Sequence, residues 1–362
     1  KILRLANNAI ISIKGLCTES GLARKYLPLE ELHMEKNKLV SIKAESFINL
    51  NCLKRLNLSN NHICLLDLDS FSSLNQLTYL NLSFNAITQL EDQIFRNLKN
   101  LEHLELKNNL IEFISSGQFI NQGKLKVLNL ESNKINKLGD SEVDEVVPQT
   151  IEPPPRAFST FKHWHKMSDY LSDNRTTHIQ GTGPFRRMYN LEDLDLSNNS
   201  LATLRNDNFM GMDNLKTLDL SSNQIETIET LSFRLLRSLK HLTLVNNSID
   251  KLDKHLFKGL LSLEKLCLSG NKLEVVESEQ FRDLSNLKTL NLDSNQIGAV
   301  ESRTFMHLRN LVSVNLDKNH LKELDVRAMS GLEKLTKVLV SNNEFTEEAA
   351  LKLGQLGQKV VL

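Results

Sequence analysis

The sequence is poor in cysteine, proline and tryptophan, and it carries no net charge. Its 362 residues include 4 cysteines, and none of these forms a CxxC pair or a close cluster, so neither a disulfide framework nor a cysteine zinc site is indicated. The formal net charge is zero, which gives no reason to expect nucleic acid binding as a property of the whole molecule. No apolar run approaches the roughly 18 residues that a membrane-spanning helix needs. Contact with a membrane would therefore depend on a segment outside this chain.

Catalytic and metal-binding motifs are missing as well. There is no GxSxG, no HExxH, no P-loop and no glycine-rich dinucleotide motif. The nearest approach to a metal site is His163, His165 and His178, but no cysteine accompanies them, and His163 and His165 would point in different directions on a helix. We therefore expect no enzymatic activity, no metal and no other cofactor. The four thiols are expected to lie singly in or near the core: Cys17, Cys52, Cys64 and Cys267.

What the sequence has in abundance is one phrase, LxxLxLxxNxL, repeated in register. The segments LNLSFNAITQL from Leu80 and LDLSNNSLATL from Leu194 are two copies. Aligned on its asparagine, the phrase occurs in thirteen units, and ten of the twelve steps between them are 24 residues, the exceptions being 29 and 66. The aligned asparagines are Asn8, Asn37, Asn61, Asn85, Asn109, Asn133, Asn199, Asn223, Asn247, Asn271, Asn295, Asn319 and Asn343. Such a fixed period predicts a stack of similar coils.

Each column of the repeat has a physical role. Side chains alternate across a strand, so the two leucines of LxL are expected to point inward and the residue between them outward. The asparagine comes where the chain turns, and its amide is expected to bond backbone groups of its own turn and of neighbouring turns. Ten residues after most of these asparagines comes an aromatic residue that fills the outer arc. These residues are Phe47, Phe71, Phe95, Phe119, Phe209, Phe233, Phe257, Phe281 and Phe305, with Met329 in the twelfth unit.

This pattern resembles the leucine-rich repeat family, in its typical 24-residue class with an F-x-x-L convex segment. The resemblance covers nearly the whole chain outside one insert, and it implies an α/β solenoid, a curved superhelix with a parallel β-sheet on its concave face. It also implies a class that is mostly extracellular or on the cell surface. Members of that kind usually carry cysteine-rich caps, which are not found here, so we expect a fragment, or a different cap in the short helix predicted over residues 347–356.

The chain is expected to divide into three segments. Residues 1–138 hold repeats 1–6, residues 139–184 form an insert, and residues 185–362 hold repeats 7–13 with the start of a C-terminal cap or next repeat. The insert is expected to leave from the convex side or flank, because Phe185 and Met188 resume the expected columns. Its acidic, proline-rich start favours an extended segment. Apolar residues at every third position then predict one side of a short, partner-binding helix: Phe158, Phe161, Trp164, Met167 and Tyr170.

Large side chains in one concave column predict a ligand-binding strip. The column lies six residues before the asparagine, and in four consecutive units it holds Arg55, Tyr79, His103 and Val127. Because adjacent strands lie about 4.8 Å apart, these side chains would be continuous. Phe84 lies at the rim, Glu105 and Lys107 flank the strip, and His241 with Val245 makes a weaker second patch. The alternative is ordinary variation, since scattered exposed apolar residues are normal, and aspartates such as Asp193 are common concave residues in this family.

The sequence therefore predicts a non-enzymatic recognition solenoid with a protein ligand on its concave face. We expect the ectodomain of a cell-surface receptor, or a secreted protein, acting in ligand binding, adhesion or immune signalling. Glycosylation sequons occur at Asn57, Asn81, Asn174, Asn198 and Asn246, and only Asn174 is independent of the repeat phrase. The unpaired cysteines favour the alternative, a cytoplasmic leucine-rich repeat scaffold or adaptor. A third hypothesis is an enzyme, or an enzyme regulator that covers a catalytic cleft. No nucleic acid partner is evident, and homo- or hetero-oligomerisation stays open.

Overall fold

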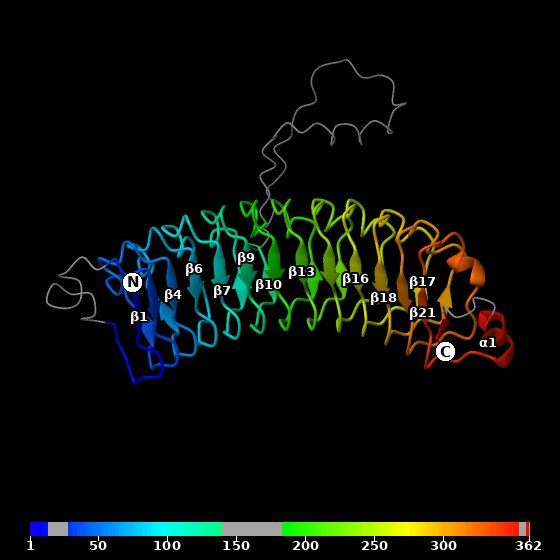
Figure 1. Ribbon diagram of the computed structural model, residues 1–362, viewed down its shortest axis with the longest axis horizontal. Coiled ribbons are helices and arrows are strands. Elements are labelled where there is room, and N and C mark those ends of the chain that lie inside the picture. Colours follow the sequence, from blue (N-terminus) through cyan, green and yellow to red (C-terminus); the bar gives the residue numbers. More distant parts are fainter. Residues whose placement is uncertain (14–27, 140–182, 355–359, 362) are drawn as a thin grey trace, which may run out of the picture.

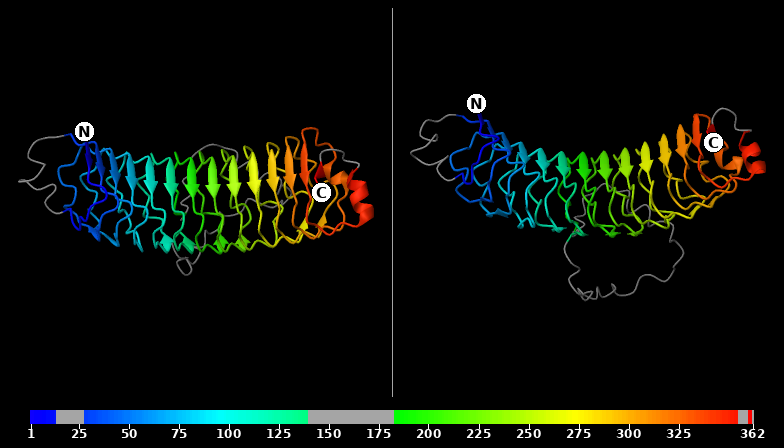
Figure 2. Two further views of the ribbon diagram at one scale, coloured as in Figure 1. Left: turned by 60° about the horizontal axis from the view of Figure 1, so that its bottom comes forward. Right: turned by 90° about the horizontal axis from the view of Figure 1, so that it is seen from below.

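The chain forms an arc of stacked coils (Figure 1). The computed structural model describes residues 1–13, 28–139, 183–354 and 360–361. One 14-stranded sheet runs the length of the arc, and Figure 2 shows its strands side by side along the inner, concave edge. All of its strand pairs are parallel, as the repeat pattern predicts. The predicted curved solenoid with a concave parallel sheet is therefore confirmed.

The strands are short because each coil contributes only the xLx segment to the sheet. In spatial order they are β1 (Ile2–Arg4), β2 (Glu31–His33), β4 (Arg55–Asn57), β6 (Tyr79–Asn81), β7 (His103–Glu105), β9 (Val127–Asn129), β11 (Asp193–Asp195), β13 (Thr217–Asp219), β15 (His241–Thr243), β16 (Lys265–Cys267), β18 (Thr289–Asn291), β20 (Ser313–Asn315), β21 (Lys337–Leu339) and β22 (Val360–Val361). The central residues of the strands from β2 to β21 are buried and their flanking residues largely are not, which is the alternation that a strand imposes.

A second set of two-residue strands follows the asparagine turns and pairs between neighbouring coils. These are β3 (Ser41–Ile42) with β5 (Leu65–Leu66), β8 (Phe113–Ile114) with β10 (Lys137–Leu138), β12 (Thr203–Leu204) with β14 (Thr227–Ile228), and β17 (Val275–Val276) with β19 (Ala299–Val300). They lie on the ascending flank, by which we mean the side of the solenoid that begins directly after the concave strands.

Regular helix is confined to the C-terminal part of the described chain. A 3-10 helix, η4 (Val326–Met329), takes the outer arc of the twelfth unit, and α1 (Glu347–Leu353) follows the last asparagine. The Thr346 side chain caps α1 by accepting a hydrogen bond from the Ala349 N–H. The predicted helix over residues 347–356 is present but ends earlier, at Leu353. Gly354 follows as its C-cap, and residues 355–359 lie outside the described chain.

The repeat asparagines join each coil to the one before it. The Nδ2 group of Asn223 donates to the carbonyl of Leu220 in its own coil at 3.1 Å and to that of Leu196 in the preceding coil at 3.0 Å. Its Oδ1 atom accepts the N–H of Leu201 at 3.0 Å. The same three bonds recur at every repeat asparagine from Asn37 onward. Because they satisfy backbone groups at the turn, losing one asparagine would leave several of them unpaired.

The outer arc is filled by a column of phenylalanines that stack from coil to coil. The rings of Phe47, Phe71, Phe95 and Phe119 are stacked in succession, and every such pair in the described chain has a centroid separation between 5.7 and 6.4 Å. All of these rings are buried, together with the leucines of the strands. One coil could not bury this surface alone, so the column stabilises the stack and not the single repeat.

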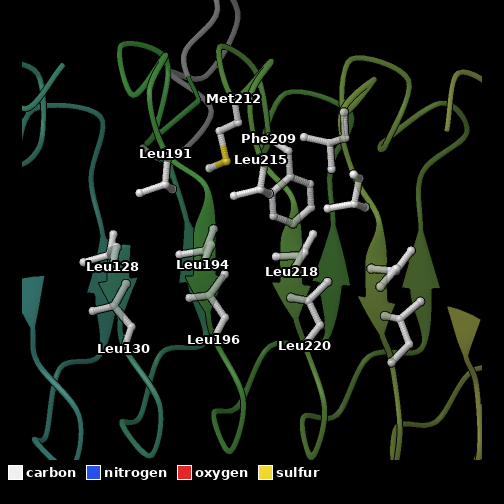
Figure 3. Packing of buried hydrophobic residues seen from close by; sticks show 14 of the residues in the cluster. Leu128, Leu130, Leu191, Leu194, Leu196, Phe209, Met212, Leu215, Leu218 and Leu220 are labelled. Carbon is white, nitrogen blue, oxygen red and sulfur yellow. The ribbon is translucent and has the colours of Figure 1, made fainter. Parts of the chain in front are cut away.

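The coils on the two sides of residues 140–182 pack directly against each other. Strand β9 pairs with β11, and Leu128 is the register partner of Leu194 in the sheet. The side chains of these two residues lie side by side in the core (Figure 3). The ring of Phe185 stacks on that of Phe119 at 6.4 Å, which places it in the column predicted for it. The solenoid is thus continuous across this point. The insert itself lies outside the described residues, with its predicted apolar stripe from Phe158 to Tyr170 and the three histidines from His163 to His178.

The cysteines depart from expectation. Cys267 is buried, as predicted, and burial raises the pKa of its thiol. Cys52 and Cys64 are unpaired but exposed, so the expectation that they lie in or near the core is wrong. Both stand at loop positions outside the leucine, asparagine and phenylalanine columns, and only those columns are forced inward. Cys17 lies outside the described residues.

Candidate ligand-binding surface

Four adjacent strands bring the predicted strip together. Arg55, Tyr79, His103 and Val127 are direct partners in the register of β4, β6, β7 and β9. The guanidinium carbon of Arg55 lies 4.2 Å from the centroid of the Tyr79 ring, and the Tyr79 and His103 rings are 6.3 Å apart and tilted. We call these four residues the concave strip. The first three residues are close in succession and Val127 is next in register, while contact of the strip with a ligand stays a prediction.

The Tyr79 side chain is held in place from two sides. Arg55 covers its ring through a cation–π contact, and the Nδ2 group of Asn81 donates to its hydroxyl at 3.4 Å. Asn81 is itself fixed, because its Oδ1 atom accepts the N–H of Ser83 at 2.9 Å. A ring that is already oriented loses little freedom on binding, which favours its use as an interface anchor.

The rim of the sheet, one residue before each asparagine, is built in the left-handed backbone conformation. The rim residues are Asn7, Lys36, Asn60, Phe84, Asn108, Ser132, Asn198, Ser222, Asn246, Gly270, Ser294, Lys318 and Asn342. All have positive φ, between +54° and +57° except for +66° at Gly270. Asparagine and glycine tolerate this conformation best, whereas a bulky side chain in it is an outlier. Phe84 is the aromatic residue in this column, and it is 47% exposed.

Phe84 lies on the rim of the coil that carries Tyr79. Tyr79 begins β6, which ends at Asn81, and Phe84 follows in the turn. Its use together with the concave strip stays a prediction. A ligand that touches both residues must extend along the direction of this strand, from its first residue to the rim.

Beyond the strip, the concave face becomes acidic. We call Glu105, Glu131, Asp195 and Asp219 the acidic group. Burial raises the pKa of Glu105, and nearby Asp195 raises it further while His103 and Lys107 act against the rise. Burial likewise raises the pKa of Asp195, with Asp219 and Glu131 adding to the effect and hydrogen bonds from Ser197 opposing it. These carboxylates are thus held close to one another on adjacent strands.

Little positive charge offsets the acidic group. Lys107, which was predicted to flank the strip, forms an ion pair with Glu131. Asp219 is satisfied by the N–H of Ser221 at 2.8 Å, which is a neutral partner. The sequence interpretation treated concave aspartates as ordinary and missed Glu131. The column six residues before the asparagine reveals the strip when units are compared. The same comparison of the columns two and four residues before the asparagine would have revealed the acidic group.

The second predicted patch is less coherent than the strip. His241 on β15 is exposed. Its register partners are Thr217 on β13 and Lys265 on β16. Val245 is half-buried and lies toward the other end of the same segment. No contact joins these two side chains to a larger aromatic or apolar surface in the described chain. The concave strip is the stronger candidate for this reason.

The sequons occupy two kinds of position. Asn57 and Asn81 stand on the concave strands and are register partners of each other, two residues beyond Arg55 and Tyr79 of the strip. Asn198 and Asn246 stand on the rim and are exposed. Asn174 lies outside the described residues.

Other kinds of site find little support in the described part of the chain. No group of three or more His, Cys, Asp or Glu side chains there is arranged to hold a metal ion. Within the same residues, no helix has both the length and the apolar character needed to cross a membrane. A shallow hollow of about 380 Å³ on the ascending flank is lined by Glu274, Val275, Gly298 and His320 among others, but it holds no catalytic combination of groups.

Comparison with known proteins gives a consistent result. A family model described as leucine rich repeat matches residues 28–87, 80–135, 170–225, 189–249, 237–297 and 285–345. A search of curated protein sequences finds no match. Among solved structures, a leucine-rich repeat protein of Leptospira interrogans has a TM-score of 0.70 at 22% identity, covering 92% of this chain and 72% of that one.

Two further solved structures come from complexes. The structure of a TLR13–ssRNA13 complex has a TM-score of 0.63 at 23% identity, covering 99% of this chain and 53% of that one. An octameric complex of latrophilin 3, Unc5D and FLRT2, in which FLRT2 supplies the leucine-rich repeats, has a TM-score of 0.65 at 20% identity, covering 86% of this chain and 83% of that one. At these identities the likeness concerns the fold.

Proposed function

The chain belongs to the leucine-rich repeat family, and we propose that it is a non-enzymatic recognition solenoid that binds a protein ligand across the N-terminal half of its concave face. The observation that carries this proposal is the concave strip. Arg55, Tyr79 and His103 form a continuous surface of side chains that are the usual anchors of protein interfaces. The sheet beneath them is rigid, so binding requires little ordering.

The charge of the concave face favours a ligand with basic side chains beside its anchor contact. The acidic group lies next to the strip, since β9 pairs with β11, where Asp195 is the register partner of Asn129, two residues beyond Val127. Glu105 and Asp195 of this group are partly desolvated, since burial raises the pKa of each, and a cation from the ligand would replace lost solvation. The same negative charge opposes the phosphates of a nucleic acid, so a protein is preferred over an RNA ligand of the kind in the TLR13 complex.

We place this activity outside the cell or on its surface. The FLRT2 complex shows that a solenoid of this fold can assemble with other proteins, and the sequons fit passage through the secretory pathway. The alternative is a cytoplasmic scaffold or adaptor, which the unpaired thiols of Cys52 and Cys64 would suit. Both interpretations use the same concave surface.

The test begins by finding the ligand with a photo-reactive amino acid at position 79 of the full-length protein. A second protein with the same amino acid at position 289 serves as the control, because Thr289 lies in the same concave column far from the strip. Cross-links from position 79 and not from position 289 would identify the ligand. Equal cross-linking from both positions, or from 289 alone, would move the site away from the strip.

Affinity for that ligand then tests the strip itself. Tyr79→Ala with Phe84→Ala is expected to weaken binding by at least thirtyfold, because truncating an aromatic anchor costs on the order of 2 kcal/mol or more. Thr289→Ala should leave affinity unchanged. If the double variant binds as the wild type does, His241 and Val245 become the next candidates.

A further inference from the structure

The asparagines of the four sequons in the described chain differ in what their side chains contact, and this difference divides them into a concave pair and a rim pair. On the concave face, the Oδ1 atoms of Asn57 and Asn81 accept the N–H groups of Ser59 and Ser83 at 3.1 and 2.9 Å. Those two serines are the hydroxyl residues of the sequons, and both are buried. The Nδ2 atom of Asn81, to which a sugar would be attached, donates to the Tyr79 hydroxyl. A sugar there would replace one of the two N–H groups of this amide and place carbohydrate over the strip.

The rim sequons present the opposite situation. Asn198 is exposed, has φ of +54°, and makes no side-chain hydrogen bond within the described residues. Asn246 is also exposed at φ +54°, and its Oδ1 atom would lie 2.2 Å from a Cβ at Gly270. Gly270 is the one glycine of the rim column, so its missing side chain leaves room for the Asn246 amide. The two rim residues beside Asn198, Ser132 in the preceding coil and Ser222 in the following coil, are small as well.

An independent observation separates the two halves of the ascending side. Exposed apolar side chains gather on the rim and flank of the second to fifth units, where no rim residue belongs to a sequon. They are Val40, Leu65, Phe84, Leu110 and Phe113, each at least 36% exposed. In the three units from Asn199 to Asn247, the first and last of which carry the rim sequons, the matching flank positions hold Thr203, Thr227 and Lys251, and an exposed apolar residue returns only at Val275 in the next unit. Carbohydrate would suit the polar half and would obstruct the apolar half.

We propose that N-linked glycans occupy Asn198 and Asn246 on the rim, that Asn57 and Asn81 on the concave strands stay unmodified, and that the ligand crosses the rim only at its apolar N-terminal part. This rests on the proposed passage through the secretory pathway. The glycans thereby lie on the part of the rim that the protein ligand does not cover. The bare asparagines Asn57 and Asn81 keep the strip open and Tyr79 oriented.

The test is a map of occupied sites on the full-length protein made through the secretory pathway of a eukaryotic host. The Asn174→Gln variant is used, so that the sequon outside the described residues does not contribute. Enzymatic removal of glycans in heavy-oxygen water followed by mass spectrometry is expected to label Asn198 and Asn246 and to leave Asn57 and Asn81 unlabelled. A label at Asn57 or Asn81, or an unlabelled Asn198 or Asn246, overturns the proposal.

A gain of glycosylation tests the rim geometry. His62→Ser copies the N-N-S phrase of the natural rim sites onto Asn60, an exposed rim residue beside Phe84. It is expected to add one glycan-sized step in mass, whereas His62→Ala, which creates no sequon, should add none. Absence of the added step contradicts the claim that rim position governs modification. Neither measurement uses a ligand, so a correct glycan map with no binding at the strip refutes the proposed function alone, and a glycan on Asn81 with binding intact refutes this inference alone.

Discussion

At the scale of single residues, Phe84 stands where the backbone favours a different side chain. Its φ of +56° matches the rim asparagines and serines of the other units. An aromatic side chain in this conformation costs on the order of 1 kcal/mol relative to asparagine. A costly residue that is also exposed contributes nothing to the core. This is the pattern expected of a residue retained for recognition.

The Phe84→Asn variant is therefore expected to be more stable than the wild type and to bind its ligand less tightly. The gain should be about 1 kcal/mol, measured as a higher midpoint of urea unfolding with an unchanged slope. Asn60→Phe, the reverse change at a neighbouring rim position, should lower the midpoint by a similar amount. A less stable Phe84→Asn protein would show that the ring packs usefully on the rim.

Gln122 is a second residue at odds with its column. It is buried thirteen residues after its asparagine, where the other units place residues such as Leu98 and Met212. Its Nε2 group donates to the carbonyl of Phe95 at 2.7 Å, but that carbonyl already accepts the N–H of Leu98, and the Gln122 Oε1 atom has no partner. A buried unpaired oxygen is unfavourable, and an apolar residue of similar size would remove it.

The Gln122→Leu variant should accordingly unfold at a higher urea concentration, with a gain of about 1 kcal/mol. The matched control is Gln280→Leu, because both amide atoms of Gln280 are bonded: Nε2 to the Leu252 carbonyl at 3.1 Å and Oε1 to the Glu277 N–H at 3.0 Å. That change should destabilise the protein. Destabilisation by both would mean that the Gln122 oxygen is satisfied in solution.

At the scale of the elements, the asparagine turns hold the strands in register more firmly than the charges along the sheet edge do. Lys54 and Glu30, and likewise Lys126 and Glu102, form ion pairs of 2.7 and 2.8 Å between neighbouring coils. These groups are exposed, and screened surface pairs contribute little. Each repeat asparagine instead satisfies buried backbone groups of two coils at once.

Burial of Asp195 in the central strands, with a smaller contribution from neighbouring carboxylates, gives the protein a specific dependence on pH. The pKa of Asp195 is raised above its ordinary value of 3.8 by burial and by Asp219 and Glu131. A carboxyl whose pKa is higher in the folded state binds more protons there than in the unfolded state. The free energy of unfolding therefore falls as pH rises through the interval between 3.8 and the raised folded value.

The Asp195→Asn variant should remove this contribution. An asparagine is acceptable at the position, because Asn129 in the preceding coil accepts the N–H of Glu131 at 2.9 Å much as Asp195 accepts that of Ser197 at 2.9 Å. The variant is expected to be more stable than the wild type near neutral pH, and the difference should shrink as the pH is lowered toward 4, measured by urea unfolding across that range. A difference that does not change with pH would assign the effect to packing.

At the scale of the whole molecule, the repeat period alone was sufficient to predict the architecture. The leucine, asparagine and phenylalanine columns are forced by burial and by hydrogen bonding at the turns, so their positions follow from spacing. The adjacency of Arg55, Tyr79 and His103 followed in the same way. The exposure of Cys52 and Cys64 did not, since loop positions are not forced inward. The mutual pKa effects of Glu105 and Asp195 depend on burial that no spacing rule supplies.

Closure of the solenoid across the insert leads to a prediction about the whole chain. Replacing residues 139–184 by the four residues that follow Leu66, 67–70, restores a 24-residue unit between Leu138 and Phe185. Because β9 already pairs with β11 and Phe119 already stacks on Phe185, stability should change by roughly 1–2 kcal/mol at most.

Thermal unfolding and ligand binding of this deletion variant, measured in parallel, decide the role of the insert. A normal melting temperature with lost binding would support a partner site in the stripe from Phe158 to Tyr170. Failure to fold would instead show that the stripe packs on the solenoid and belongs to its core.

The asparagine bonds between coils also determine how the molecule responds to force. Every junction is nearly the same, and a pull on the two ends of the arc loads all junctions in series. An end coil has a neighbour on one side only, so it peels away first and exposes the next coil to the same load. Each 24-residue coil that opens releases roughly 80 Å of extended chain, and the longer steps of 29 and 66 residues release more. The solenoid is thus a tether that lengthens in mostly equal steps, and it yields gradually where a globular domain of this size would give way at once.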